Sequence, residues 1–169
     1  MAVSLYAASV PVFQQMLGGL SDVLAKASAH ATERKIDPEA YLKLRLFPDM
    51  FPLVRQVQIA CDFAKSVSAR LAQAEVPAWE DNEASFDDLQ ARIARTRDFI
   101  AGLDAAAFEG ADAREIVLRP GTPKEKRLTG QAYVLAYGLP QFFFHVTTSY
   151  ALLRHAGIEI GKRDFMGRY

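Results

Sequence analysis

The side chains most able to do chemistry lie in one long run with almost no charged residues, positions 131–157. Polar groups and one leucine follow each other there at steps of four, three, four and three: Gln141, His145, Thr148, Leu152 and His155. In a helix this spacing places them on one face. An imidazole among apolar residues can act as a base, a metal ligand or a hydrogen-bonded core group, and the last is the commonest role. His145 is therefore the side chain to explain.

His155 cannot share a metal ion with His145. Ten residues of helix at about 1.5 Å each separate them by roughly 15 Å. His155 lies just before Gly157, and His30 lies at the end of the first predicted helix. At such positions a histidine interacts with unpaired carbonyls and the helix dipole. Any partner of His145 must therefore come from another helix.

The second predicted helix offers polar partners on both of its edges. Gln58, Asp62 and Lys65 lie along one edge, and Gln56 lies on the other. Whichever edge faces the last helix could supply a hydrogen bond or an oxygen ligand to His145. Asp62 and Lys65 could instead form a local ion pair, worth about 0.3 kcal/mol when exposed. The sequence leaves the choice of edge open.

Other reactive groups and motifs give little evidence of a catalytic site. Cys61 follows the apolar period of its helix with no basic residue on the same face, which indicates an inert packed thiol. The sequence contains no phosphate loop, dinucleotide fingerprint, HExxH motif or serine-hydrolase elbow. Phe142, Phe143 and Phe144 must point in three directions around a helix, so at least one should face a partner. This predicts either a partner helix or a homodimer surface, and we expect a homodimer.

Composition restricts the class of protein. A chain of 169 residues suits one domain, and 20 basic residues balance 20 acidic ones. We therefore expect no general attraction to nucleic acid or anionic membranes. No apolar run reaches the roughly 18–20 residues of a membrane span, and the N-terminus lacks a secretory pattern. A single cysteine excludes an internal disulfide. We expect a cytoplasmic protein.

Apolar residues at helical spacing predict four main antiparallel helices. The first covers about 9–30 and is capped by Ser9, and the second covers about 50–72. The third begins at Ser85 and reaches Leu103, and the last runs from Thr129 to Gly157. Pro140 should kink the last helix, because proline removes a backbone donor and clashes with the preceding turn. In the third helix, Arg92, Arg95 and Arg97 are expected mostly on the solvent side.

Smaller elements are predicted between these helices. Asp37, Pro38 and Glu39 open a short helix that Pro48 stops. Residues 75–83 have no helical period and form a loop. Two β-prone pieces within 114–129 flank a turn-rich tip, which predicts a hairpin. The tail after Gly157 shows no period.

Several of these segments resemble the bacterial domain of unknown function numbered 1993. The resemblance covers almost the whole chain and is carried by 4–6 (SLY), 10–13 (VPVF), 48–53 (PDMFPL), Gln56, 139–145 (LPQFFFH) and 161–165 (GKRDF). That family is similar in turn to the DinB and YfiT-like putative metalloenzymes. The resemblance implies a four-helix bundle that commonly dimerises. The characterised relatives of that group include metal-dependent thiol transferases and a thiol-dependent isomerase, so the resemblance implies chemistry of this kind.

The metal of those relatives is held by three histidines, one on the second helix and two on the last. His145 matches the second histidine of the last helix, while Gln141 occupies the place of the first. On the second helix, Gln56 or Gln58 is the nearest equivalent. One imidazole with two neutral amides is a poor site for zinc or nickel, and a hard ion could use Asp62 only if it faces inward. A divalent metal is possible but disfavoured.

We predict one all-α domain over residues 1–169, a DinB-like four-helix bundle with a short extra helix and a small β-hairpin before the last helix. The predicted ligand-binding residues are Gln56, Gln58, Asp62, Gln141, His145 and Thr148. The favoured function is small-molecule binding around His145, the best candidate for catalysis or for a metal ligand. One alternative is a noncatalytic dimer whose buried polar residues are structural. Another is a divalent-metal-dependent, thiol transferase-like enzyme, and enzyme status stays open.

Overall fold

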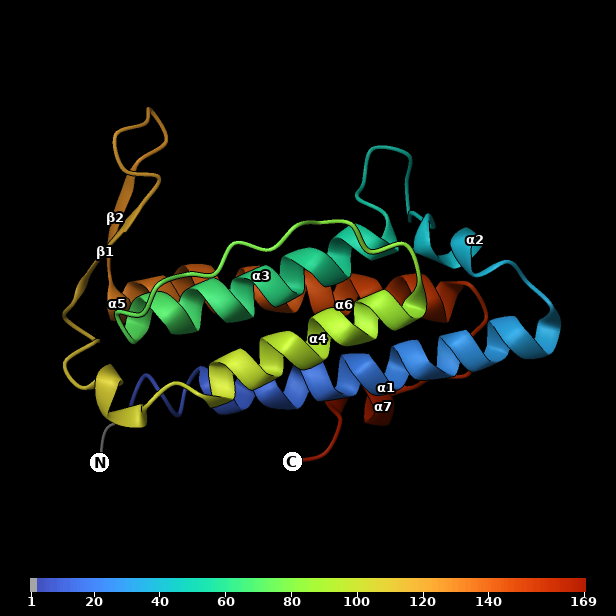
Figure 1. Ribbon diagram of the computed structural model, residues 1–169, viewed down its shortest axis with the longest axis horizontal. Coiled ribbons are helices and arrows are strands. Elements are labelled where there is room, and N and C mark those ends of the chain that lie inside the picture. Colours follow the sequence, from blue (N-terminus) through green and yellow to red (C-terminus); the bar gives the residue numbers. More distant parts are fainter. Residues whose placement is uncertain (1–2) are drawn as a thin grey trace.

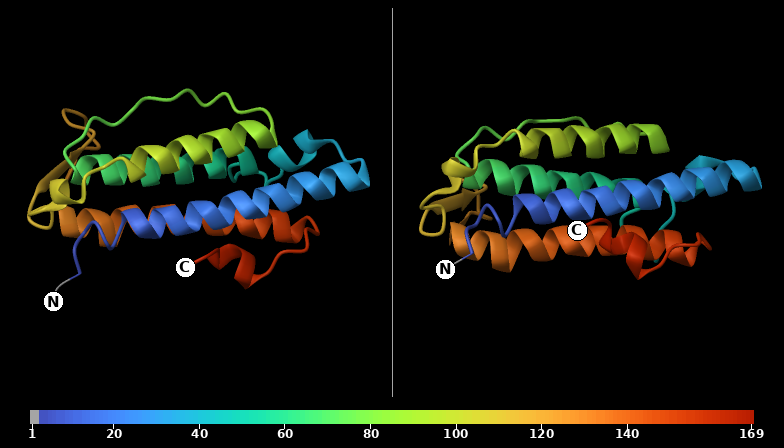
Figure 2. Two further views of the ribbon diagram at one scale, coloured as in Figure 1. Left: turned by 60° about the horizontal axis from the view of Figure 1, so that its bottom comes forward. Right: turned by 90° about the horizontal axis from the view of Figure 1, so that it is seen from below.

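Four long helices lie side by side along the molecule (Figures 1 and 2). The computed structural model describes residues 3–169. The long helices are α1 (Val10–Arg34), α3 (Leu53–Leu71), α4 (Phe86–Ala101) and α6 (Leu139–His155). Their apolar faces meet in one core, with α1 and α3 at opposite corners and α4 and α6 between them. The predicted all-α bundle is confirmed.

The helix directions differ from the antiparallel arrangement that we expected. Figure 1 shows α3 and α4 running in one direction, and α1 and α6 in the other. The extended link at residues 72–85 returns along the whole bundle before α4 begins. A link of that length reaches roughly 45 Å, whereas the 19 residues of α3 span about 28 Å. The expectation was wrong for this pair because a long link allows a parallel neighbour.

Helix starts follow local hydrogen bonding. Ser85 caps α4, since its hydroxyl accepts from Asp88 N at 3.0 Å. Thr129 likewise accepts from Ala132 N at 3.3 Å. Ser9 stands at the start of α1, but its hydroxyl donates to the Leu5 carbonyl at 2.5 Å. The predicted Ser9 side-chain cap is therefore wrong, because the preceding turn offers a closer acceptor.

The last long helix begins irregularly. A short α-helical turn α5 (Gly130–Ala132) leads into a π-helical segment η2 (Tyr133–Gly138), and α6 follows directly. The irregularity that we expected at Pro140 thus takes the form of wider turns just before it. Wider turns relieve the clash between a proline ring and the carbonyl four residues earlier. A β-carbon at Gly138 would lie 2.7 Å from a methyl group of Val67 on α3, so the Val67 side chain packs directly on the backbone of this segment.

The smaller elements include two helical turns that the sequence did not suggest. The short helix α2 (Pro38–Leu42) is present, although it ends before Pro48. The predicted hairpin forms as β1 (Glu115–Leu118) and β2 (Lys126–Thr129), antiparallel and projecting from one end of the bundle (Figure 1). A 3₁₀ turn η1 (Ala105–Phe108) precedes it. The additional helix α7 (Lys162–Met166) packs against α1 (Figure 2).

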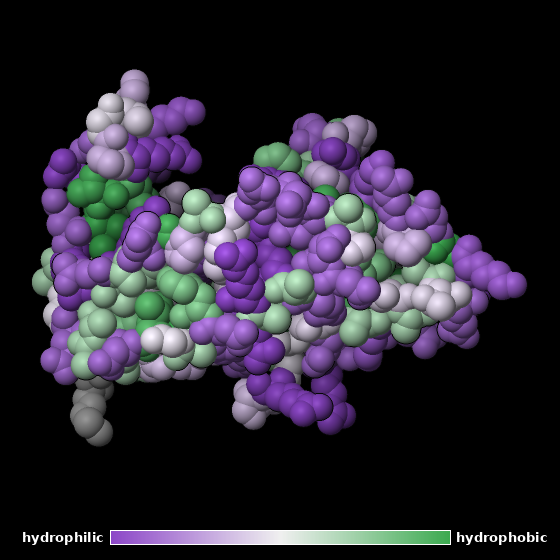
Figure 3. Space-filling model, in the orientation of Figure 1, coloured by the Kyte–Doolittle hydropathy of each residue, from purple (hydrophilic) through white to green (hydrophobic). Residues whose placement is uncertain are grey.

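The surface in Figure 3 is mostly hydrophilic, with a hydrophobic area where the hairpin joins the bundle. Other large apolar side chains that are exposed include Phe47, Phe51, Leu135 and Phe144. Within residues 3–169, none of the helices combines the length and the apolar character that a membrane span needs.

Candidate functional site

His145 pairs with Gln56 across the α3–α6 contact. The His145 Nδ1 atom lies 2.7 Å from Gln56 Oε1, and both side chains are buried. The structure therefore answers the question of edges. It is the Gln56 edge of α3 that faces the last helix.

A second hydrogen bond fixes the orientation of the Gln56 amide. Its Nε2 donates to the Phe51 carbonyl at 3.0 Å, and a carbonyl can only accept. The amide oxygen must then face His145, so the imidazole donates from Nδ1. In a neutral ring the other nitrogen, Nε2, carries a lone pair. The site is thus an imidazole held in one tautomer with its acceptor nitrogen free.

The imidazole is neutral at physiological pH. Burial, together with a smaller effect of the nearby positive charge of Arg55, lowers the pKa of His145 to about 4. Among the described residues no group hydrogen-bonds to Nε2. Within residues 3–169, two side-chain atoms are both fully buried and without a hydrogen-bond partner, and Nε2 is not one of them. Since Nε2 has no partner, it must retain contact with solvent.

Two aromatic rings contact the imidazole. Phe63 stacks on it with centroids 6.1 Å apart, and Phe144 meets it edge-on at 5.2 Å. Phe144 is 55% exposed, and Phe51, whose carbonyl holds Gln56, is 54% exposed. His145 is not among the residues that line four cavities found within residues 3–169. The site is therefore a shallow apolar surface with one polar acceptor.

Two other predicted site residues share the helix of His145. Gln141 is half-buried, and we find no hydrogen bond from its side chain within residues 3–169. Thr148 is buried, and its hydroxyl donates to the Phe144 carbonyl at 2.7 Å. Thr148 thus uses its proton within the helix, while Gln141 keeps its amide available.

The structure does not bring Gln58 and Asp62 to His145. Gln58 donates to Glu83 at 2.7 Å and accepts from Arg55 at 3.2 Å. Asp62 pairs with Lys65 at 2.9 Å, as the spacing predicted, and with Arg92 at 3.0 Å. These residues belong to a second polar cluster between α3, α4 and the link at 72–85.

Arg92 is the centre of that cluster and was misjudged from the sequence. We expected it on the solvent side, yet it is 4% exposed. Besides Asp62, it contacts Asp81 at 2.9 Å and Glu83 at 2.8 Å. Burial disfavours its charge, but the Glu83 hydrogen bond and the Asp62 charge together raise its pKa. The sequence did contain a signal that Arg92 is buried, because it follows Leu89 by three residues and precedes Thr96 by four, which is the spacing of core residues in a helix.

Cys61 lies in the core beside this cluster. Burial raises the pKa of its thiol to about 12, despite a hydrogen bond with Thr96 and the charge of Arg92. The thiol stays protonated at physiological pH and is a poor nucleophile. This agrees with an inert packed side chain.

The donor set around His145 does not suit a tightly bound divalent metal. The Gln56 oxygen already accepts from His145, which leaves one imidazole nitrogen and the Gln141 amide. In the part of the chain that the structure describes, no three His, Cys, Asp or Glu side chains come close enough to hold an ion. Amide oxygen is a weak ligand for zinc or nickel.

Comparisons with known proteins agree with this architecture. The model of a family described as "Domain of unknown function (DUF1993)" matches residues 5–166. The crystal structure of a DinB family member protein from Shewanella denitrificans, at 1.83 Å resolution, is similar with a TM-score of 0.91 and 38% sequence identity. That likeness covers 98% of this chain and 93% of the other. No curated protein matches the chain.

Proposed function

This chain belongs to the DUF1993 family and has a DinB-like fold, and from that premise we propose that it binds a small molecule at the α3–α6 face. The ligand donates a hydrogen bond to His145 Nε2. The observation that carries the proposal is the Gln56–His145 hydrogen bond at 2.7 Å, which holds the imidazole as a Nδ1–H tautomer. A pre-oriented acceptor binds more tightly because little freedom is lost on binding.

The low pKa of His145 favours binding over proton transfer. A general base works best when its pKa is near the working pH. A group with a pKa of about 4 holds its lone pair at pH 7 but takes up a proton poorly. An uncharged donor such as a hydroxyl group suits this nitrogen.

The rings around the imidazole favour an apolar body on the ligand. Phe144 meets the imidazole edge-on, and Phe51 supplies the carbonyl that holds Gln56; each of these side chains leaves about half of its surface exposed. Covering apolar surface stabilises a complex by about 25 cal/mol per Å². An aromatic alcohol or phenol combines both features.

Nuclear magnetic resonance on the ¹⁵N-labelled protein tests this proposal, with phenol as the probe. We expect the free protein to show the Nδ1–H tautomer, and phenol to shift the Nε2 resonance of His145. Toluene, which has no donor, should shift the neighbouring phenylalanines without that Nε2 change. Gln56→Leu removes the oxygen that orients the ring and should weaken phenol binding, while Gln58→Leu is the matched control from the other edge.

Two results would contradict it: a free protein in the Nε2–H tautomer, or phenol and toluene giving the same response at His145. Either would favour the second candidate, a noncatalytic dimer in which the Gln56–His145 pair only fixes helix register. The exposed rings of Phe51 and Phe144 favour that candidate independently, because large apolar side chains are often covered by a partner.

A further inference from the structure

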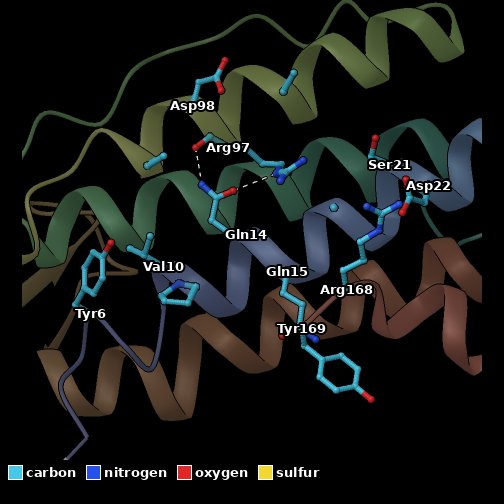
Figure 4. A pocket seen from close by; sticks show the side chains of 14 residues that line it. Tyr6, Val10, Gln14, Gln15, Ser21, Asp22, Arg97, Asp98, Arg168 and Tyr169 are labelled. Atoms are coloured by element: carbon cyan, nitrogen blue, oxygen red, sulfur yellow. Dashed lines mark hydrogen bonds between the residues drawn. The ribbon is translucent and has the colours of Figure 1, made fainter.

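A groove on the other side of the bundle offers a separate binding site. It lies between α1 and α4, has a volume of about 1160 Å³, and is bordered by the last residues of the chain (Figure 4). Tyr6, Val10 and Pro11 line it near the start of α1, and Arg97 lies at its middle. None of these residues belongs to the His145 site.

Arg97 is held in place before any ligand arrives. Its Nε donates to Gln14 Oε1 at 3.0 Å, and Gln14 Nε2 donates back to the Arg97 carbonyl at 2.6 Å (Figure 4). The guanidinium lies over Gly18, where a β-carbon would be 3.8–3.9 Å from its atoms. A β-carbon at that distance would make ordinary van der Waals contact, so the guanidinium packs against this turn of α1.

The outer nitrogens of Arg97 remain available. Within residues 3–169, neither Nη1 nor Nη2 has a hydrogen-bond or ion-pair partner. A guanidinium presents such nitrogens in a planar fork that matches a carboxylate. Because Gln14 already restricts the side chain, less freedom is lost when an anion binds.

Two cations, Arg97 and Arg168, and two carboxylates, Asp22 and Asp98, line the groove. Asp22 and Arg168 lie together at the far end, where they also border a neighbouring cavity. Asp98 follows Arg97 on α4, but Figure 4 shows its carboxylate directed away from Gln14 and the guanidinium. The Arg97 position therefore favours an anion more than either end of the groove does.

The tail that borders this groove is anchored on α1. Gln15 Nε2 donates to the Met166 carbonyl at 2.9 Å, and Lys26 pairs with Asp164 at 2.6 Å. At Gly19 a β-carbon would lie 2.8 Å from the Phe165 carbonyl oxygen, so the tail packs directly on the helix backbone. The tail residues that border the groove are therefore part of the folded structure.

We propose that the groove binds a small carboxylic acid with an apolar body. The carboxylate pairs with the free nitrogens of Arg97, and the apolar body lies toward Tyr6, Val10 and Pro11. The proposal is independent of the His145 site, because no residue is shared.

Isothermal titration calorimetry with 4-phenylbutanoate tests this site. We expect saturable binding that weakens at least about tenfold in Arg97→Gln, since hydrogen bonds to charged groups are strong. Gln14→Leu keeps the charge but removes the brace, and it should also weaken binding. Arg95→Gln, on the same helix but outside the groove, should leave the affinity unchanged. Circular dichroism verifies that each variant is folded.

Two further probes test the two halves of the ligand. The neutral analogue 4-phenylbutan-1-ol and the bare anion acetate should each bind more weakly than 4-phenylbutanoate by about tenfold or more. Equal binding of the alcohol would overturn the role of the carboxylate, and equal binding of acetate would overturn the apolar part. No saturable binding, or unchanged binding in Arg97→Gln, overturns the whole proposal.

Discussion

The two polar clusters of this bundle have opposite effects on the charge of their central side chains. His145 is kept neutral, because burial and Arg55 lower its pKa to about 4. Arg92 is kept charged, because Glu83, Asp62 and neighbouring acids surround it. The difference follows from the partner groups, since an amide orients an imidazole without adding charge, whereas carboxylates stabilise a cation.

At the level of the residue, His145 makes folding depend on pH. Below its ordinary pKa of 6.5 the unfolded chain binds a proton that the native state accepts only near pH 4. The free energy of unfolding therefore falls as the pH drops from about 6.5 to about 4, by roughly 2 kcal/mol. Urea unfolding at pH 7 and about pH 4.5 measures this loss.

His145→Asn serves as the test variant, because its amide can still donate to Gln56. We expect its free energy of unfolding to fall less with acid than that of the natural protein. His155→Asn, an exposed position on the same helix, is the matched control and should follow the natural protein. Identical pH dependence in His145→Asn and the natural protein would disprove the prediction.

At the level of the element, Arg92 ties the long link at 72–85 to the bundle. Its guanidinium contacts Asp81 and Glu83 of the link and Asp62 of α3. These ion pairs join two parallel helices to the segment that connects them. The link is therefore expected to be as stable as the helices beneath it.

Arg92→Met should lower the free energy of unfolding by about 3 kcal/mol, because the mostly buried Glu83 loses its cation. Hydrogen exchange should rise selectively in the link. Arg95→Met, which removes only a contact of the guanidinium with the Trp79 ring, should cost about 1 kcal/mol or less. Equal effects of the two substitutions in urea unfolding would contradict a structural role for Arg92.

Gly138 sets the close approach between the π-helical segment and α3. Gly138→Ala would place a β-carbon 2.7 Å from Val67 and 3.3 Å from the Tyr133 carbonyl oxygen. We expect a loss of about 1–3 kcal/mol in the free energy of unfolding. Gly102→Ala, where the nearest atom would be 3.5 Å away, should be close to neutral. If both substitutions shift the melting temperature equally, the contact with Val67 does not explain the loss of stability.

At the level of the whole molecule, the second candidate function predicts a homodimer that covers the exposed rings of Phe51 and Phe144. Phe51→Glu combined with Phe144→Glu places charge on this face and should produce monomers in size-exclusion chromatography with light scattering. Ala91→Glu, at an exposed position on α4, is the control and should leave the mass unchanged. A natural protein that is monomeric at high micromolar concentration would exclude this dimer.

The sequence by itself determined the helices, the hairpin and the cap at Ser85. Those features depend on apolar spacing and hydrogen bonds within a few residues, so they can be read along the chain. It also identified His145 and Gln56 as possible partners. The π-helical segment and α7 were missed, because each depends on packing against a neighbouring helix.

Only the tertiary structure decided how the helices are rotated and directed. Rotation of α3 about its axis brings Gln56 to His145 and turns Gln58 and Asp62 toward Arg92. The long link allows α4 to lie parallel to α3, which the spacing of apolar residues cannot reveal. Periodicity defines which residues share a face, whereas the neighbour of that face depends on how all the helices pack together.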